Sequence, residues 1–185
     1  MNQHTVRRVL PHEYPKYRTH LKSLDIDSRK LRFGISTSDE TIDKLCDNFE
    51  ADTIHHILFA VEDYDLNFIG IGHISIDNNM ELAFSVLKEH QGRGIGGALM
   101  LRCIQWCRAN NILKGHMVCL STNSVIRKLC VKHGIKVHTE YGETMADIEL
   151  DSPNIVTYVN EAAAVNLGTA DYIGKRITRP WTFSN

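Results

Sequence analysis

The chain contains the glycine-rich stretch Gln91-Gly92-Arg93-Gly94-Ile95-Gly96-Gly97 between a predicted strand and a predicted helix. Closely spaced glycines let the backbone turn tightly, so that several N–H groups point at one place. A helix that starts there adds the positive end of its dipole. The stretch therefore predicts a site for the phosphate groups of a ligand.

The residues before this stretch predict a run of strands. Residues 54–62, 68–76 and 81–87 are rich in β-branched and aromatic side chains and are separated by turn signals, so they predict an antiparallel meander. Farther upstream, the spacing of apolar residues predicts a strand at 5–10 and two helices, at 11–24 and 39–49.

The residues after the glycines predict helices alternating with strands. Apolar residues three and four apart predict a helix over 95–109, and a short buried strand follows at 117–120. Asn123 or Ser124 caps a further helix that ends at Gly134. The remaining elements are a hairpin, 135–141 with 144–150 around Gly142, and a last helix from Ser152-Pro153 to about Leu167.

Two strand–helix–strand units after a meander predict a mixed α/β sheet flanked by helices. A chain of 185 residues is long enough to bury one core in a single domain. Ligands of such sheets bind where parallel strands diverge at their carboxyl ends, and the glycine stretch lies at such an end.

The glycines alone leave two further readings open, a dinucleotide site and a turn that binds no ligand. Gly92, Gly94 and Gly97 also fit the G-x-G-x-x-G pattern of dinucleotide enzymes. That reading requires an acidic ribose-binding residue about twenty positions on, yet no Asp or Glu lies between Glu89 and Glu140. A turn without a ligand is the second alternative, and the entropic cost of so many glycines argues against it.

Charge is distributed unevenly along the chain. Residues 91–139 carry eight Lys and Arg and no acidic residue, so the remaining 13 basic and 22 acidic residues leave −9 elsewhere. A small polyanionic ligand suits this basic segment, and a solvated basic face is the alternative.

Composition restricts the class of protein further. No run approaches the ~20 apolar residues of a membrane span, and the N-terminus lacks a secretory signal, so we expect a cytoplasmic chain without membrane or nucleic-acid partners. Five cysteines without a Cys-x-x-Cys pair predict no disulfide framework. The sequence spacing would allow a metal site formed by Cys103, Cys107, His116 and Cys119. Free cysteines are more often simply buried, so no metal is predicted.

Three segments of the chain resemble one known family. The stretch 91–96 resembles the Gln/Arg-x-x-Gly-x-Gly/Ala signature of the GNAT acetyltransferase superfamily. Residues 81–86 look like that family's fourth strand, and 123–135 look like its segment of Asn, helix and Lys-x-Gly-Phe. Residues 28–33 are further similar to the region before the second helix in Pat-type protein lysine acetyltransferases. The resemblance covers about 5–150, which predicts a GNAT domain at 1–150 and a helical extension of the same domain at 151–185.

The resemblance implies a mainly antiparallel mixed sheet that is splayed between strands 4 and 5. It implies that acetyl-CoA is the acyl donor and that an amine, either a small molecule or a protein lysine, accepts the acetyl group directly. The cofactor residues that it implies are Phe84, Ser85, Val86 and Leu87 for the pantetheine amides, Gln91, Gly92, Arg93, Gly94, Ile95, Gly96 and Gly97 for the pyrophosphate, and Asn123 on the other side of the splay. A plain helix N-cap is a second reading of Asn123.

The predicted chemistry requires a base. A lysine-like amine with a pKa of ~10.4 is almost fully protonated at pH 7, and only its neutral form attacks a thioester. Glu81 resembles the glutamate that accepts this proton in several relatives, and a solvent-facing charge at the strand edge is the alternative.

The family's usual proton donor is absent from this sequence. Many relatives carry a tyrosine in a Leu-Tyr-x-Lys arrangement, where this chain has Leu129-Cys130-Val131-Lys132. Cys130 is interpreted as a buried side chain, with a nucleophilic role as the alternative. The missing tyrosine also leaves open a non-catalytic acyl-CoA-binding sensor. The segment after Asp151 is a candidate for packing on a second copy in a homodimer, or for covering the acceptor site.

Overall fold

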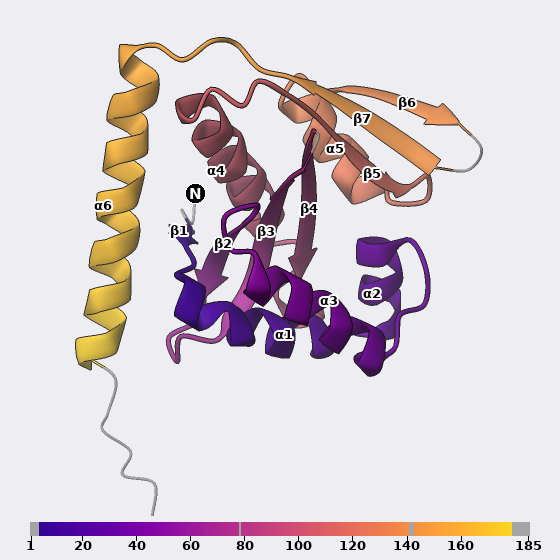
Figure 1. Ribbon diagram of the computed structural model, residues 1–185, viewed down its shortest axis with the longest axis horizontal. Coiled ribbons are helices and arrows are strands. Elements are labelled where there is room, and N and C mark those ends of the chain that lie inside the picture. The colour runs from indigo at the N-terminus through magenta and orange to yellow at the C-terminus, as the bar shows by residue number, and fades with distance from the viewer. Residues whose placement is uncertain (1–3, 78, 141–142, 179–185) are drawn as a thin grey trace, which may run out of the picture.

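The computed structural model describes residues 4–77, 79–140 and 143–178. Seven strands form one sheet in the order β1-β2-β3-β4-β5-β7-β6 (Figure 1). Their bounds are β1 (Arg7–Arg8), β2 (His56–Glu62), β3 (Phe68–Ile76), β4 (Met80–Val86), β5 (Lys114–Leu120), β6 (Lys136–Glu140) and β7 (Glu143–Glu149). All neighbouring strands are antiparallel except β4 and β5, so the predicted mixed, mainly antiparallel sheet is confirmed.

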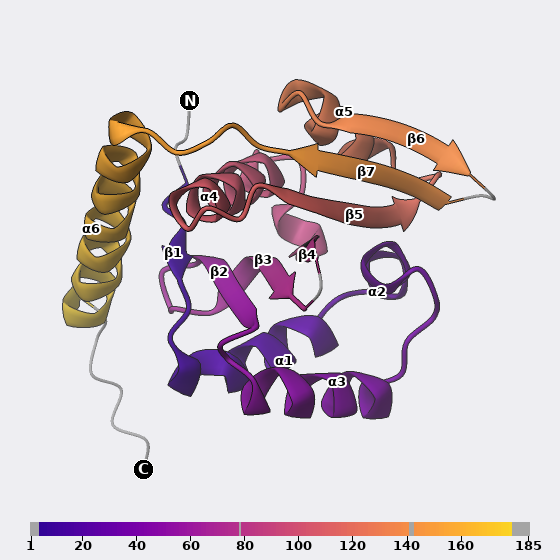
Figure 2. The ribbon, with the colours of Figure 1, turned by 45° about the horizontal axis from the view of Figure 1, so that its top comes forward.

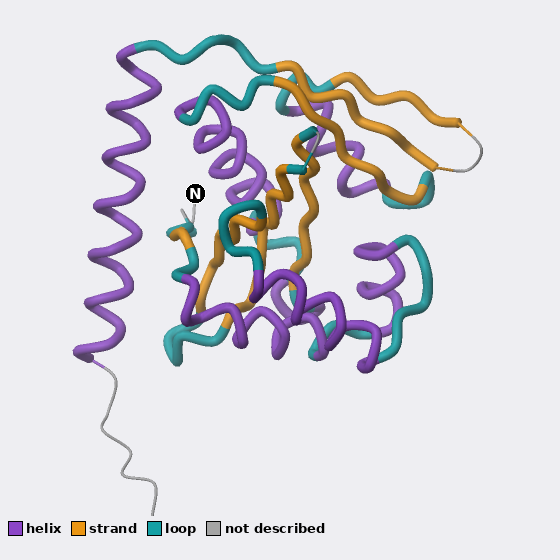
Figure 3. The backbone as a smooth tube through the Cα atoms, viewed as in Figure 1, coloured by secondary structure: helices purple, strands orange, loops and turns teal. Residues whose placement is uncertain are grey.

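Six α-helices and two short 3-10 helices surround the sheet within the described residues (Figure 3). The α-helices are α1 (Tyr14–Lys22), α2 (Ile26–Phe33), α3 (Asp39–Ala51), α4 (Ile95–Ala109), α5 (Ser124–Lys132) and α6 (Ile155–Thr178), and the 3-10 helices are η1 (Pro11–Glu13) and η2 (Lys88–His90). None of these described helices is both long and apolar enough to cross a membrane.

The sheet carries one hydrophobic core on each face because residues of a strand alternate between faces. On one face, α4 and α5 pack on β2 to β7 through side chains such as Phe59, Leu99 and Met117. On the other face, α1 and α3 cover β2 and β3 through Tyr17, Leu21 and Ile42 (Figure 2). This arrangement fixes the start of α4 beside the end of β4.

Helix α2 was not predicted as a helix, because none of its residues is fully buried and its apolar pattern is weak. Local signals nevertheless define both of its ends. The Asp25 carboxylate accepts a 2.7 Å hydrogen bond from the N–H of Ser28, and Gly34 ends the helix in the left-handed conformation at φ 77°. Helix α2 is therefore a short element whose two ends are fixed by local hydrogen bonds and by Gly34.

Helix α6 is longer than predicted, since it continues past Leu167 to Thr178. Gly168 lies one residue past the predicted end and lets the helix approach β1 closely, because a Cβ there would lie 2.8 Å from the Cβ of Arg7. The helix starts at Ile155, where the Oδ1 of Asn154 accepts the N–H of Thr157 at 3.0 Å. The predicted hairpin is present as β6 and β7, and Gly142 lies outside the described residues.

Candidate functional site

The site begins where β4 and β5 separate. These parallel strands pair at two positions, Met80 with Gly115 and Glu81 with His116. Beyond them β4 stays with β3 as far as Val86, while β5 stays with β7. Backbone groups of residues 82–86 that face β5 therefore have no strand partner among the described residues, and the predicted splay is confirmed.

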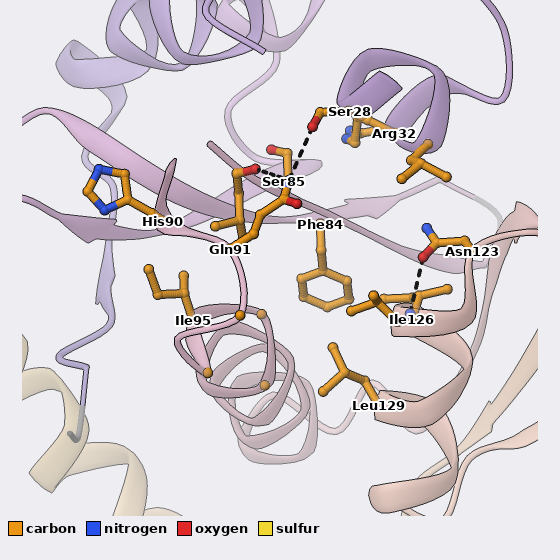
Figure 4. A pocket seen from close by; sticks show the side chains of 17 residues that line it. Ser28, Arg32, Phe84, Ser85, His90, Gln91, Ile95, Asn123, Ile126 and Leu129 are labelled. Carbon is orange, nitrogen blue, oxygen red and sulfur yellow. Dashed lines mark hydrogen bonds between the residues drawn. The ribbon is translucent and has the colours of Figure 1, made fainter. Parts of the chain in front are cut away.

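A cavity of about 270 Å³ occupies this opening (Figure 4). It is bounded by α2, the end of β4, the glycine stretch and the start of α5. The lining residues are Ser28, Leu31, Arg32, Phe84, Ser85, Val86, His90, Gln91, Gly92, Gly94, Ile95, Gly96, Gly97, Asn123, Val125, Ile126 and Leu129. The structure thus brings together ten of the predicted cofactor residues from three separate segments of the chain.

The glycine stretch has the backbone of an anion site. Gly92 and Gly94 have φ angles of 73° and 87°, which residues with a Cβ adopt only at a cost. Gly94 is the N-cap of α4, no side-chain cap hydrogen bond is present there among the described residues, and the first turn contains no acidic residue. The first N–H groups of a helix have no intrahelical partner, so those of α4 are left for a ligand.

Gln91 connects the glycine stretch to both neighbouring elements. Its Nε2 donates to the Val86 carbonyl at 3.0 Å and to the Ser28 hydroxyl at 3.1 Å (Figure 4). The first bond holds the turn against β4, and the second ties it to α2. Gln91 therefore shapes the cavity mouth, a role that its place in the motif alone does not reveal.

Asn123 has the N-cap role that was one of its two readings. Its Oδ1 accepts the N–H of Ile126 at 3.2 Å, which caps α5. Its Nδ2 group makes no hydrogen bond within the described residues, and the side chain lines the cavity (Figure 4). Capping thus fixes the side chain and leaves two N–H donors for a ligand.

A buried pair lies directly behind the cavity wall. His20 of α1 and Ser85 of β4 are 3 % and 7 % exposed, and the Nε2 of His20 lies 2.9 Å from the Oγ of Ser85. The Nδ1 of His20 lies 2.7 Å from the Phe68 carbonyl, so Nδ1 carries the proton and Nε2 accepts the Ser85 hydroxyl. Burial lowers the pKa of His20 to about 4, which keeps the ring neutral.

A second polar cluster connects α2 to the sheet. The guanidinium of Arg32 donates to the Tyr17 hydroxyl at 3.1 Å, and its Nη2 lies 3.3 Å from the Nδ1 of His73. His73 in turn pairs with His56 through an Nε2–Nδ1 distance of 3.1 Å. Burial holds the pKa of His73 well below its usual value, so this ring is neutral and serves as an acceptor for Arg32.

Three predicted site residues lie outside the cavity lining. Glu81 is exposed at the last pair of β4 with β5, four residues before Ser85. Leu87 is partly buried and packs against the core, and its N–H donates to the Ile69 carbonyl at 3.0 Å. Arg93 is exposed, and its carbonyl lies 2.8 Å from the Nε2 of His4.

The cysteines are placed as small core residues. All five are free and buried, and Cys130 is 1 % exposed. Burial raises the pKa of the Cys130 thiol to about 11, which argues against a thiolate nucleophile at pH 7. Among the described residues, no three His, Cys, Asp or Glu side chains gather as a metal site would need.

Sequence reasoning missed the contribution of α2 to the site. Ser28, Leu31 and Arg32 line the cavity from this helix, and His90, Val125, Ile126 and Leu129 complete its walls. The similarity of residues 28–33 to the Pat-type region was the available signal, but it did not indicate which side chains face the cavity.

Comparison with known structures supports the fold. The GNAT domain of Pat from S. lividans is 19 % identical, covers 78 % of this chain and 89 % of its own, and superposes with a TM-score of 0.65. The paia N-acetyltransferase of Thermoplasma acidophilum, solved in complex with coenzyme A, is 18 % identical, with coverages of 78 % and 97 % and a TM-score of 0.58. The yncA structure from Salmonella typhimurium, with its cofactor acetyl-CoA, is 18 % identical, with coverages of 83 % and 99 % and a TM-score of 0.60.

No curated protein matches the chain in sequence. A family model does match, over residues 21–135, and its description is the acetyltransferase (GNAT) family. The matched residues run from α1 through the splay and the glycine stretch to the end of α5, and therefore contain the whole cavity lining. The chain accordingly belongs to the GNAT acetyltransferase family.

Proposed function

We propose that this chain transfers the acetyl group of acetyl-CoA directly to a primary amine. The observation that carries the proposal is the cavity itself, which joins the uncapped start of α4 to the open side of β4. The N–H groups at the start of α4 can bind a pyrophosphate, and the unpaired backbone groups of β4 can pair with a chain of amides. Few ligands other than coenzyme A present both groups in one molecule.

The donor would lie along the splay. Its pyrophosphate would accept hydrogen bonds from the N–H groups at 92–97, at the positive end of the α4 dipole. Its pantetheine amides would pair with free backbone groups of Phe84 to Val86 as an added strand. Asn123 would donate from α5 on the other side, because its side chain lines the cavity and its Nδ2 makes no hydrogen bond with the part of the chain that the structure describes.

Glu81 is the proposed general base. It stands on β4 at an odd-numbered position, as Ser85 does, and so shares the sheet face that α1 and α3 cover. Because Glu81 lies outside the cavity lining, a water molecule would carry the proton from the amine to its carboxylate. The neutral amine attacks the thioester carbon, the C–S bond breaks, and coenzyme A leaves as a thiolate that takes up a proton.

The departing thiolate needs no dedicated acid in this scheme. A thiol with a pKa near 8.5 is a tolerable leaving group at neutral pH. The family's tyrosine position holds the buried Cys130, which is a poor replacement acid because it does not line the cavity. Water at the open cavity would protonate the product.

Two measurements test the proposal. Titration calorimetry with acetyl-CoA should show one site per chain, and S-acetylpantetheine, which lacks the pyrophosphate, should bind much more weakly if the glycine stretch holds that group. A free-thiol assay over a panel of small amines and lysine peptides should then show release of coenzyme A that depends on the amine. Release at the same slow rate with every amine would contradict acetyl transfer.

A second candidate function is a non-catalytic acyl-CoA sensor. The replacement of the tyrosine by buried Cys130 is the observation that favours it. A sensor would bind acetyl-CoA in the calorimeter and release no thiol with any amine. The acceptor panel therefore separates the two functions, and it also distinguishes a small amine from a protein lysine.

A further inference from the structure

The outer face of α6 has a composition that is unusual for a helix at the protein surface. This helix stands at the edge of the molecule, and in two views nothing lies on its outer side (Figures 1 and 2). Its inner face is polar or small, and its apolar side chains point outward, the reverse of the usual pattern of a surface helix. The inward residues are Thr157, Glu161, Ala164, Gly168, Tyr172 and Lys175, and the exposed large apolar ones are Ile155, Val156, Tyr158, Val159, Val165, Leu167, Ile173 and Ile177.

Polar contacts hold the inner face in place. Glu161 forms a bidentate pair with Arg102 of α4, with both N–O distances 2.7 Å. The Arg7 guanidinium of β1 lies 4.3 Å from the centre of the Tyr172 ring, and Lys175 donates to the Glu62 carbonyl at 3.2 Å. The helix therefore cannot rotate to bury its apolar side without breaking these contacts.

The exposed apolar area is large enough for an interface. The eight large apolar side chains of α6 are 49–81 % exposed. Six of them lie on the same side of the helix as Asn166, all except Tyr158 and Val165, and at on the order of 100 Å² each these six reach the upper end of the 300–600 Å² of the largest patch on a typical monomer. No charged side chain interrupts this face between Ile155 and Ala170, because Glu161 points inward to Arg102.

The outward stripe repeats every three and four residues. Its members are Val156, Val159, Ala163, Asn166, Ala170, Ile173 and Ile177, all of them exposed. This spacing is that of the a and d positions of a coiled coil, with a single polar residue among apolar ones. We define these seven residues as the α6 stripe.

The α6 stripe reads the same from either end. Two large residues, one alanine and the central asparagine are followed by one alanine and two large residues. In an antiparallel pair of such helices, Asn166 would meet its own copy at the two-fold axis, Ala163 would meet Ala170, and Val159 would meet Ile173. A surface that complements itself under a two-fold rotation is the requirement for an isologous dimer interface.

We propose that α6 pairs antiparallel with the α6 of a second copy of this chain, with the two-fold axis at Asn166. Paired asparagines fix the register, since each amide satisfies the other. Alanine on both sides of the axis allows the helices to approach closely, and the outer Val and Ile residues supply apolar contact. Helix α2, which lines the cavity, lies on the opposite side of the molecule from α6, so pairing through α6 leaves this side of both copies uncovered (Figure 2). This inference does not depend on the proposed reaction.

Charge substitutions test both the pairing and its direction. Sedimentation equilibrium of the full chain should give twice the 21.0 kDa chain mass at tens of micromolar. Val159→Glu with Ile173→Glu should give a monomer, because the glutamates would face each other across the axis. Val159→Glu with Ile173→Lys should restore the dimer, because each glutamate then faces a lysine. Ile54→Glu, at a side chain that is 80 % exposed on another surface, is the control and should stay dimeric.

Cross-linking gives a second readout that does not depend on destabilising the dimer. All native cysteines are buried, so Asn166→Cys introduces an exposed thiol on α6. Mild oxidation should link two chains through this position, whereas Ile54→Cys should stay largely unlinked.

Several outcomes would overturn the proposal. They are a wild-type monomer at 100 μM, a dimer that persists in the Glu/Glu variant, and a Glu/Lys variant that stays monomeric. A monomer that floats with phosphatidylcholine–phosphatidylglycerol vesicles would assign the face to a lipid surface instead.

Discussion

The hydroxyl of Ser85 donates a 2.9 Å hydrogen bond to the Nε2 of His20, and this bond connects the cavity wall on β4 to the buried side of α1. Because the Nδ1 of His20 is committed to the Phe68 carbonyl, the pair functions only with a neutral imidazole. Burial of a group that must stay uncharged makes the stability of the protein sensitive to acid.

We therefore expect the free energy of unfolding to fall as the pH falls from 6.5 to about 4. In this window the unfolded chain binds a proton on His20 that the folded protein excludes, because the folded pKa is about 4. The loss amounts to about 1.4 kcal/mol per pH unit, or roughly 3 kcal/mol in all, and His73 adds to it in the same direction. Urea titrations at half-unit pH steps measure this slope.

His20→Gln should flatten the slope over this window, because glutamine does not titrate. His12→Gln, at an exposed histidine, is the matched control and should keep the wild-type slope. A wild-type slope in the His20 variant would show that another group governs the acid sensitivity.

Glu81→Gln tests the proposed base. Turnover should fall at least ten-fold, because the amide cannot accept the proton of the attacking amine. The Kd for acetyl-CoA in the calorimeter should not change, since Glu81 lies outside the cavity lining. Glu89→Gln makes the same change in charge at an exposed residue of η2 and should keep turnover. Full activity of Glu81→Gln would remove this residue from the mechanism.

Asn123 allows capping to be separated from ligand binding. Asn123→Asp keeps an oxygen for the N–H of Ile126 but loses both amide donors, so stability should hold while acetyl-CoA binds more weakly. Asn123→Ala loses both functions, and its unfolding free energy should drop by about 0.5–2 kcal/mol. Thermal melts and calorimetry on the two variants make the comparison. Equal acetyl-CoA affinity of wild type and Asn123→Asp would reduce Asn123 to a cap.

The pair of Arg102 and Glu161 should matter more than its neighbour on the same helix. Arg102 is 5 % exposed, so Glu161→Ala would leave a buried guanidinium without its partner and should destabilise the chain by about 3 kcal/mol. Asp171→Ala breaks the more exposed pair with Lys175 and should change stability by less than about 0.5 kcal/mol. Equal effects in urea titrations would contradict this view of how α6 is held.

The parts of the fold that the sequence predicted well are those with a strong local period. The bounds of α4 were predicted to the residue, because its apolar face and the glycines before it are unambiguous. The strands β2, β3 and β4 followed from β-branched runs between turns. Two local signals also predicted helix starts: the glycine spacing predicted the tight turn before α4, and Asn123 was one of two predicted caps of α5.

Tertiary contacts explain what the sequence did not predict. The last helix was predicted to end near Leu167, yet α6 continues through Gly168, where the close approach of Arg7 leaves no room for a Cβ. Helix α2 has little apolar periodicity, because it packs over the edge of the cavity and buries no residue fully. The bond from Gln91 to Ser28 joins positions 63 residues apart, a separation at which no local pattern gives a signal.

The two residue pairs that join β4 to β5 have a mechanical consequence. Hydrogen bonds run continuously through β1 to β4 and again through β5, β7 and β6, but within the described ranges the two sets of strands share only these two pairs. A ligand that hydrogen-bonds to β4 on one side and to Asn123 on the other would act as a tie between the two sets. A bound ligand would then reduce the movement of the two sets of strands relative to each other, including at positions far from the reacting atoms.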